Sequence, residues 1–77
     1  MPEKTIYLAQ TFWWVDGRLE AGEPLQFMRV DDARAAGEAM AGSAPGVAVY
    51  SLVGEPAADL WGEPVVLSSY GAAPKAA

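Results

Sequence analysis

The side chains with the clearest chemical potential in this 77-residue chain are its carboxylates, because the chain contains neither histidine nor cysteine. Without histidine it lacks the commonest general base and metal ligand near neutral pH. Without cysteine it lacks thiolate nucleophiles, disulfides and thiolate metal ligands. Composition therefore excludes serine–histidine triads, cysteine–histidine pairs and histidine-based zinc sites.

The triplet Gly-Glu-Pro occurs three times, at residues 22–24, 54–56 and 62–64. Its three glutamates could form a cluster for a divalent cation, since hard cations take oxygen ligands. The alternative is turn chemistry, in which glycine permits a positive φ, proline fixes φ and glutamate keeps the loop hydrated. The sequence favours turns, because no loop carries the dense alternating acids of a calcium site. We therefore expect no metal site.

Two further sets of carboxylates could support acid–base chemistry. Asp31 and Asp32 are adjacent, but a helix start accounts for both, with Asp31 as the N-cap and Asp32 favourable to the helix dipole. An enzyme that relies on Glu55, Asp59 and Glu63 would need two acids flanking a cleft, as in glycosidases. A chain of 77 residues leaves little material for such a cleft. We expect a protein that is not an enzyme, with no catalytic residue and no cofactor.

The charge of the chain is acidic, with ten Asp and Glu against five Lys and Arg and a net charge of −5. Binding to phosphate backbones depends on clustered basic side chains, so the scattered ones here predict no nucleic-acid partner. No apolar run approaches the roughly 18 residues of a membrane helix, and Gln10 interrupts the first one too early for a secretory signal. We expect a cytoplasmic protein without a membrane partner. The basic residues are Lys4, Arg18, Arg29, Arg34 and Lys75.

The first half of the chain predicts a β-hairpin. Residues 5–15 are rich in β-branched and aromatic side chains and end at Asp16-Gly17, a pair favoured in type I′ turns. The return strand begins at residues 18–20 and is broken by the triplet at 22–24, because proline has no N–H to donate. We expect pairing to resume over residues 25–29.

A short helix is predicted over residues 32–41. Glycine and proline follow it between residues 42 and 46 and end it. One stripe of the helix carries small side chains, so the helix can lie close to a sheet, with methionine filling the gap at one end. The stripe consists of Ala33, Ala36, Gly37 and Met40.

Two strands are predicted after the helix, over residues 47–53 and 65–70, joined by a loop over 54–64. The chain therefore reads as an α+β domain of ββαββ order. It should have a four-stranded, mainly antiparallel sheet with the helix packed on one face.

We expect residues 1–77 to form one small domain. The predicted ordered part covers about residues 4–71, and the alanine-rich stretch 72–77 is a predicted flexible tail. At this size a core buries only about 60% of the surface that the unfolded chain exposes, so self-association has a physical motive.

Both faces of the first strand are apolar, and one helix covers only one face. With the helix on the face of Ile6, Leu8, Phe12 and Trp14, the opposite face is left exposed, and such patches usually mark binding surfaces. A second copy is the simplest partner, although an unknown protein could take its place. The alternative is that the 54–64 loop folds back with Leu60 and Trp61 over this face. The predicted interaction surface consists of Tyr7, Trp13, Val15, Val47, Val49 and Trp61.

The leading functional hypothesis is a non-enzymatic protein–protein interaction module that acts as a homodimer. In one version the connections at 22–24 and 54–64 act as hinges, and the dimer is domain-swapped. The alternative is a small-ligand-binding domain with an aromatic-lined pocket. The aromatic residues proposed for that pocket are Trp13, Trp14, Tyr50 and Trp61.

The order of apolar and turn positions resembles a group of short bacterial proteins whose function is unassigned. The resemblance implies the ββαββ order and carries no catalytic signature, so it transfers no functional residue. It rests on the strand 7–14, the helix from Asp31 with Ala33, Ala36 and Met40, the run 46–51, the positions Gly54, Glu55, Pro56, Trp61, Gly62 and Glu63, and the close Val66, Leu67, Tyr70 and Gly71.

Overall fold

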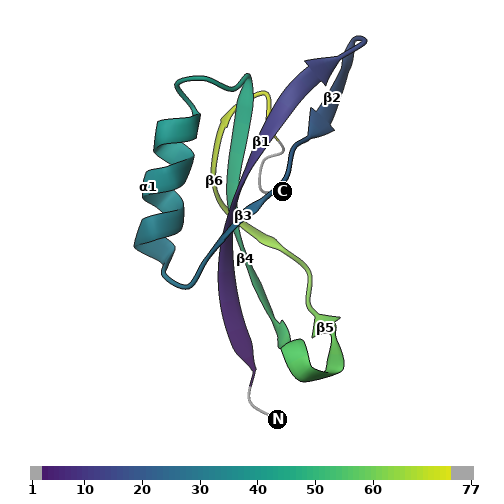
Figure 1. The fold of residues 1–77 in the computed structure, drawn as a ribbon, viewed down its shortest axis with the longest axis vertical. Helices are drawn as coiled ribbons and strands as arrows, with labels where there is room; N and C mark the ends of the chain where they lie inside the picture. The colour runs from purple at the N-terminus through teal and green to yellow at the C-terminus, as the bar shows by residue number, and fades with distance from the viewer. Residues whose placement is uncertain (1–2, 74–77) are drawn as a thin grey trace.

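The computed structural model describes residues 3–73 as one α-helix beside a curled antiparallel sheet of six strands (Figure 1). The predicted α+β class is therefore confirmed. The predicted four strands are confirmed only in part, because each outer strand is divided into two. The elements are β1 (Lys4–Val15), β2 (Arg18–Ala21), β3 (Leu25–Phe27), α1 (Val30–Met40), β4 (Gly46–Glu55), the 3₁₀ turn η1 (Pro56–Ala58), β5 (Leu60–Trp61) and β6 (Val65–Gly71).

Two long strands, β1 and β4, form the centre of the sheet. They pair antiparallel, from Lys4 opposite Gly54 to Phe12 opposite Gly46. β2 and β3 both pair with β1, and β5 and β6 both pair with β4. The sheet therefore has two central strands and two outer strands, and each outer strand consists of two separate segments.

Two of the three Gly-Glu-Pro triplets lie where the outer strands break, and the third lies at the end of β4. Residues 22–24 separate β2 from β3, and residues 62–64 separate β5 from β6. In both breaks the glycine N–H still donates to the central strand, from Gly22 to the carbonyl of Thr11 and from Gly62 to that of Val53, each at 2.8 Å. Proline then removes a donor two residues later. The two halves of the chain thus repeat one device, a long strand folded against an interrupted return strand.

The helix packs on the sheet through its small side chains, as predicted. Ala33 and Gly37 are buried, and Ala36 and Met40 are half-buried. They contact a cluster around Ala9 and Val49 on the two central strands. A Cβ atom at Gly37 would collide with Cγ2 of Val49, so glycine sets the short distance between helix and sheet here.

The helix covers the face opposite to the one that we expected. Tyr7, Ala9, Val47 and Val49 lie under it, whereas Ile6 and its neighbours on alternate positions lie on the other face. The reason is size complementarity. A helix lined by alanine and glycine approaches closely and needs short side chains below it, which Ala9 and the valines supply.

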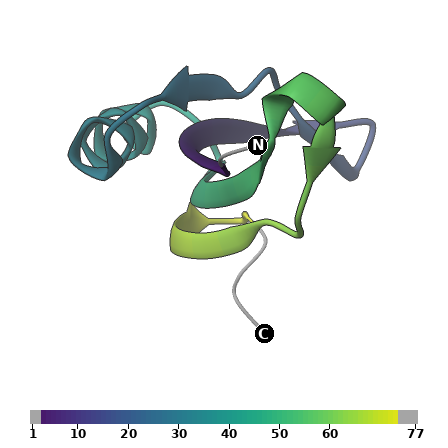
Figure 2. The same ribbon diagram turned by 90° about the horizontal axis from the view of Figure 1, so that it is seen from below.

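The second face is enclosed by the curl of the sheet, which Figure 2 shows bending away from the helix. Ile6, Leu8 and Phe12 are buried on this face. Phe12 packs with Ala48 and Ala73. Leu60 and Trp61, which we considered as a cover for the exposed sheet face, are 62% and 38% exposed. The curled sheet rather than a folded-back loop therefore covers this face.

The helix starts earlier than predicted. Arg29 occupies the N-cap position in extended conformation and makes no side-chain capping bond, so the prediction of Asp31 as the N-cap is wrong. Asp31 and Asp32 both lie in the first turn, where a carboxylate favours the positive end of the helix dipole. The apolar Val30 joins the helix because the strand before it ends at Phe27.

Residues 72 and 73, which follow the predicted ordered range, contact the rest of the domain. The Ala72 N–H donates to the carbonyl of Pro45 at 3.0 Å, and Ala73 is buried. Residues 74–77, the rest of the predicted tail, lie outside the described part of the chain.

Candidate functional site

The predicted interaction surface is divided by the structure into two groups. Val47 and Val49 are fully buried, and Tyr7 is half-buried against the helix cluster. Trp13, Val15 and Trp61 are exposed. The first group belongs to the core because the helix lies on its face. A role of the exposed group in binding remains a prediction.

The exposed aromatic residues of β1 lie on an arm that projects beyond the central sheet (Figure 1). Pairing with β4 ends at Phe12, so the last residues of β1 pair only with β2. Trp13, Trp14 and Val15 are 43%, 59% and 42% exposed. The Trp13 indole N–H donates to Oγ1 of Thr11 at 3.0 Å. The arm is a two-stranded ribbon, a structure that is marginally stable without packing.

A cavity of about 230 Å³ lies on the curled face of the sheet. Its walls are mainly apolar, and its two polar side chains are Gln10 and Tyr50. Ligand sites for drug-sized molecules usually measure about 300–1,000 Å³, so this cavity suits only a small occupant. The lining residues are Gln10, Phe12, Ala48, Tyr50, Pro64 and Val66.

The polar side chains of this cavity already bond to each other. The Tyr50 hydroxyl donates to Oε1 of Gln10 at 3.3 Å, and Nε2 of Gln10 donates to the carbonyl of Gly22 at 2.8 Å. Burial raises the pKa of the Tyr50 hydroxyl above its ordinary value of 10.0. The phenol therefore stays neutral at physiological pH, and its hydrogen bond orients the glutamine.

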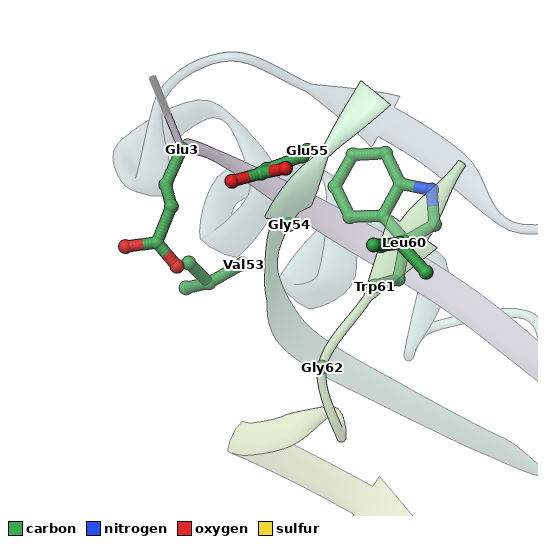
Figure 3. A pocket seen from close by; sticks show the side chains of 7 residues that line it. All are labelled: Glu3, Val53, Gly54, Glu55, Leu60, Trp61 and Gly62. Carbon is green, nitrogen blue, oxygen red and sulfur yellow. The ribbon is translucent and has the colours of Figure 1, made fainter. Parts of the chain in front are cut away.

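A second hollow, of about 340 Å³, lies at the opposite end of the sheet beside β5. Figure 3 shows the carboxylates of Glu3 and Glu55 on one side of it and the Trp61 indole on the other. The arrangement is an open hollow on the surface.

The carboxylates do not assemble into a metal-binding group in the described part of the chain. No three Asp or Glu side chains come close enough there to hold a metal ion. Of the triplet glutamates, Glu23 and Glu63 lie at separate strand breaks, and Glu55 is the last residue of β4. Within residues 3–73, no helix is long and apolar enough to cross a membrane.

Sequence reasoning identified one residue of the apolar cavity, Tyr50, and missed the rest. Gln10 offered a usable signal, because it is the first polar residue after a run of apolar residues in the opening strand. Pro64 offered none, since only the pairing of β6 with β4 brings it to the cavity. Trp13 and Trp14 line neither of the two hollows described here, and Trp61 lines the one beside β5.

Comparison with known proteins found no matching family model, no matching curated protein and no matching solved structure.

Proposed function

We propose that this protein is a non-enzymatic interaction module that works in the cytoplasm as a homodimer and binds through the edges of its sheet. The observation that carries the proposal is the position of its exposed large apolar side chains, most of which lie on outer strands or on the arm. They are Trp13, Trp14, Val15, Leu25, Met28, Val53, Leu60, Trp61 and Val65.

Exposed apolar side chains in this number favour association over an isolated monomer. Contiguous apolar patches on soluble proteins usually mark binding sites, and burying one large apolar side chain contributes about 1.5–3 kcal/mol. The domain has no disulfide to stabilise it, because it lacks cysteine. A second copy covers the apolar side chains of one sheet edge with no further component, since a twofold interface uses the same patch twice, and the apolar side chains elsewhere stay available to another protein.

Size-exclusion chromatography with light scattering over a hundredfold dilution tests the proposal. We expect a mass near twice the 8.1 kDa of the chain at the highest concentration, falling towards 8.1 kDa as the dimer dissociates. A mass of one chain throughout would refute the homodimer.

Domain swapping is a specific version of the dimer. The breaks at residues 22–24 and 62–64 each begin with a glycine that still bonds to a central strand. A change of backbone conformation after that glycine would let the next strand pair with a second copy. Mixing tagged and untagged dimers distinguishes the versions. A swapped dimer exchanges subunits only as fast as it unfolds, whereas a surface dimer exchanges freely.

A small-ligand-binding domain is the second candidate, favoured by the apolar cavity with its oriented Gln10 and Tyr50. A small apolar molecule would fit its volume and composition. Nuclear magnetic resonance shifts of the Ala48 and Val66 methyl groups, recorded against a panel of small aromatic compounds, test this. A saturable shift at both methyl groups supports a ligand site, and unmoved methyl groups refute it.

A further inference from the structure

We propose that the homodimer forms through the outer edge of β6, where two copies pair as antiparallel strands and join their sheets around a twofold axis. This inference rests on the proposed self-association and names its surface. It leaves the arm with Trp13 and Trp14 outside the dimer interface.

The outer edge of β6 has no partner among residues 3–73. β6 pairs with β4 on one side only, whereas β1 and β4 each have strands on both sides. An edge strand presents unpaired N–H and C=O groups to any extended chain, and natural proteins protect such edges with charge, proline, a bulge, shortness or a covering element.

β6 is the least protected of the outer segments. None of its seven residues, Val65–Gly71, is charged or proline. By contrast, Arg18 and Glu20 make half of β2 charged. β3 has three residues, and β5 has two, which lie between Asp59 and Glu63. The one long, uncharged edge of the sheet is therefore β6.

The helix does not shield this edge. α1 packs mainly against β1, β3 and β4, and Figure 2 shows β6 at the edge of the sheet opposite β3. The helix meets β6 on the face of the sheet, where Leu67 packs on the cluster that contains Ala33 and a Cβ atom at Gly37 would lie 3.9 Å from the Tyr70 ring. The half-buried Val66, Leu67 and Tyr70 would all gain cover from a paired copy.

A second copy is the occupant that this strand fits best. Two copies of one edge strand can pair antiparallel with each other. A twofold axis between them places N–H groups of one copy opposite C=O groups of the other. The one protective device is a bulge, where Leu67 is inserted between the residues opposite Val49 and Tyr50. The regular stretch after the bulge runs from Ser68 to Gly71, and Gly71 leaves the extended conformation with a φ of 61°, so we place the axis at Ser69, the middle of the three extended residues. No charge of β6 opposes its copy in this register.

Single-cysteine variants test the proposed β6–β6 interface, because the natural chain contains no cysteine to interfere. In Ser69→Cys the two thiols face each other across the axis, where opposed Cβ atoms lie about 4.5–5.5 Å apart, and mild oxidation should link them. Glu20→Cys, on the exposed edge of β2, is the matched control. Pairing raises the effective thiol concentration to millimolar, so we expect Ser69→Cys to cross-link roughly 100-fold faster.

A second pair of variants tests the same interface without requiring that two thiols reach the geometry of a disulfide. Ser69→Lys and Ser69→Glu should each weaken the dimer, because like charges would face each other, and their equimolar mixture should restore a heterodimer. Circular dichroism checks that each variant folds.

The outcomes separate this inference from the proposed function. A wild-type monomer in light scattering would refute the homodimer itself. The wild type could instead be a dimer while Ser69→Cys cross-links no faster than Glu20→Cys and the charge variants stay dimeric. This result would refute the β6–β6 interface but not the homodimer. Faster linking of Glu20→Cys would place the interface at β2.

Discussion

Close contact between helix and sheet depends on a single glycine. Gly37 lies on the buried stripe of α1 directly over Val49, which is fully buried. Glycine lowers the helix propensity at this position, but its lack of a side chain lets α1 lie close to the sheet, and Ala9 and Ala33 are buried between the two layers. The sequence pattern identified the stripe, and the contact explains why it contains a glycine.

The variant Gly37→Ala should therefore destabilise the protein. Overpacking against Val49 costs about 1–3 kcal/mol, and the better helix propensity of alanine returns about 1 kcal/mol. We expect a net loss of about 1 kcal/mol in urea unfolding. Gly42→Ala is the control, because its Cβ would meet only the Ala39 carbonyl at 3.6 Å. Equal stability of the two variants would show that α1 can move off the sheet without cost.

The phenol of Tyr50 should make stability depend on alkaline pH. Burial raises its pKa in the folded state above the ordinary 10.0, so the folded protein holds this proton more tightly than the unfolded chain. The resulting stability is fully present below the unfolded pKa and is lost as the pH rises through the folded pKa.

Urea unfolding of the wild type and Tyr50→Phe at about pH 8 and about pH 11 measures this effect. We expect the free energy of unfolding to fall between the two pH values more steeply for the wild type than for Tyr50→Phe. The variant is its own control, since it keeps the ring and removes only the titrating group. Parallel losses in both proteins would contradict the assigned cause.

At the scale of elements, the two hairpins use different means to turn. β1 and β2 meet at Asp16 and Gly17, which have φ values of 50° and 78°, as the predicted type I′ turn requires. β4 and β5 meet through the 3₁₀ turn η1 and the residue after it, Asp59, which has a φ of 53°. The first connection was readable from a dipeptide, whereas the second, with its two-residue strand, was expected to be part of a loop.

The variant Gly17→Ala should weaken the arm by about 1–2 kcal/mol, because a Cβ disfavours a positive φ. Hydrogen exchange of the β1–β2 amides measures the effect directly. We expect faster exchange at the Trp13–Glu20 pair than in the wild type, while the Ala9–Val49 pair of the central sheet changes little. Asp16→Asn should exchange like the wild type, since Asn-Gly suits the same turn. Unchanged exchange in Gly17→Ala would mean that the arm is not held by its turn.

The whole molecule is elongated, with principal extents of 42 × 25 × 22 Å. Its arm and its β5 end lie at opposite ends in Figure 1, and β6 runs along the side between them. A dimer joined along β6 would leave both ends free, so each copy could present Trp13 and Trp14 to another protein.

Dimerisation should make thermal stability depend on protein concentration, because mass action stabilises an associated folded state. A hundredfold increase in concentration contributes about 2.7 kcal/mol per dimer, which corresponds to a rise in Tm on the order of 5 °C. Differential scanning fluorimetry measures it. Ser69→Lys, which introduces the charge that natural edge strands carry, should show no such rise. A Tm of the wild type that does not vary with concentration would contradict the dimer.

The features that depend on neighbouring residues could be predicted from the sequence. These are the α+β class, the small-residue stripe of the helix, the turn at Asp16-Gly17 and the strand break at residues 22–24. Each follows from local backbone preference or from the period of apolar side chains, and both act within a few residues. The exclusion of histidine and cysteine chemistry likewise needed only the composition.

Which side of each strand is covered depends on contacts between elements that are distant in the sequence. Trp14 and Phe12 lie on one face of β1, yet Phe12 is buried and Trp14 is exposed, because β4 ends opposite Phe12. Val47 and Val49 became core residues because a helix of alanine and glycine fits the short side chains of their face. Period-two alternation shows which residues of a strand share a face. Which of the two faces is buried depends on contacts distant in sequence and on the curl of the sheet.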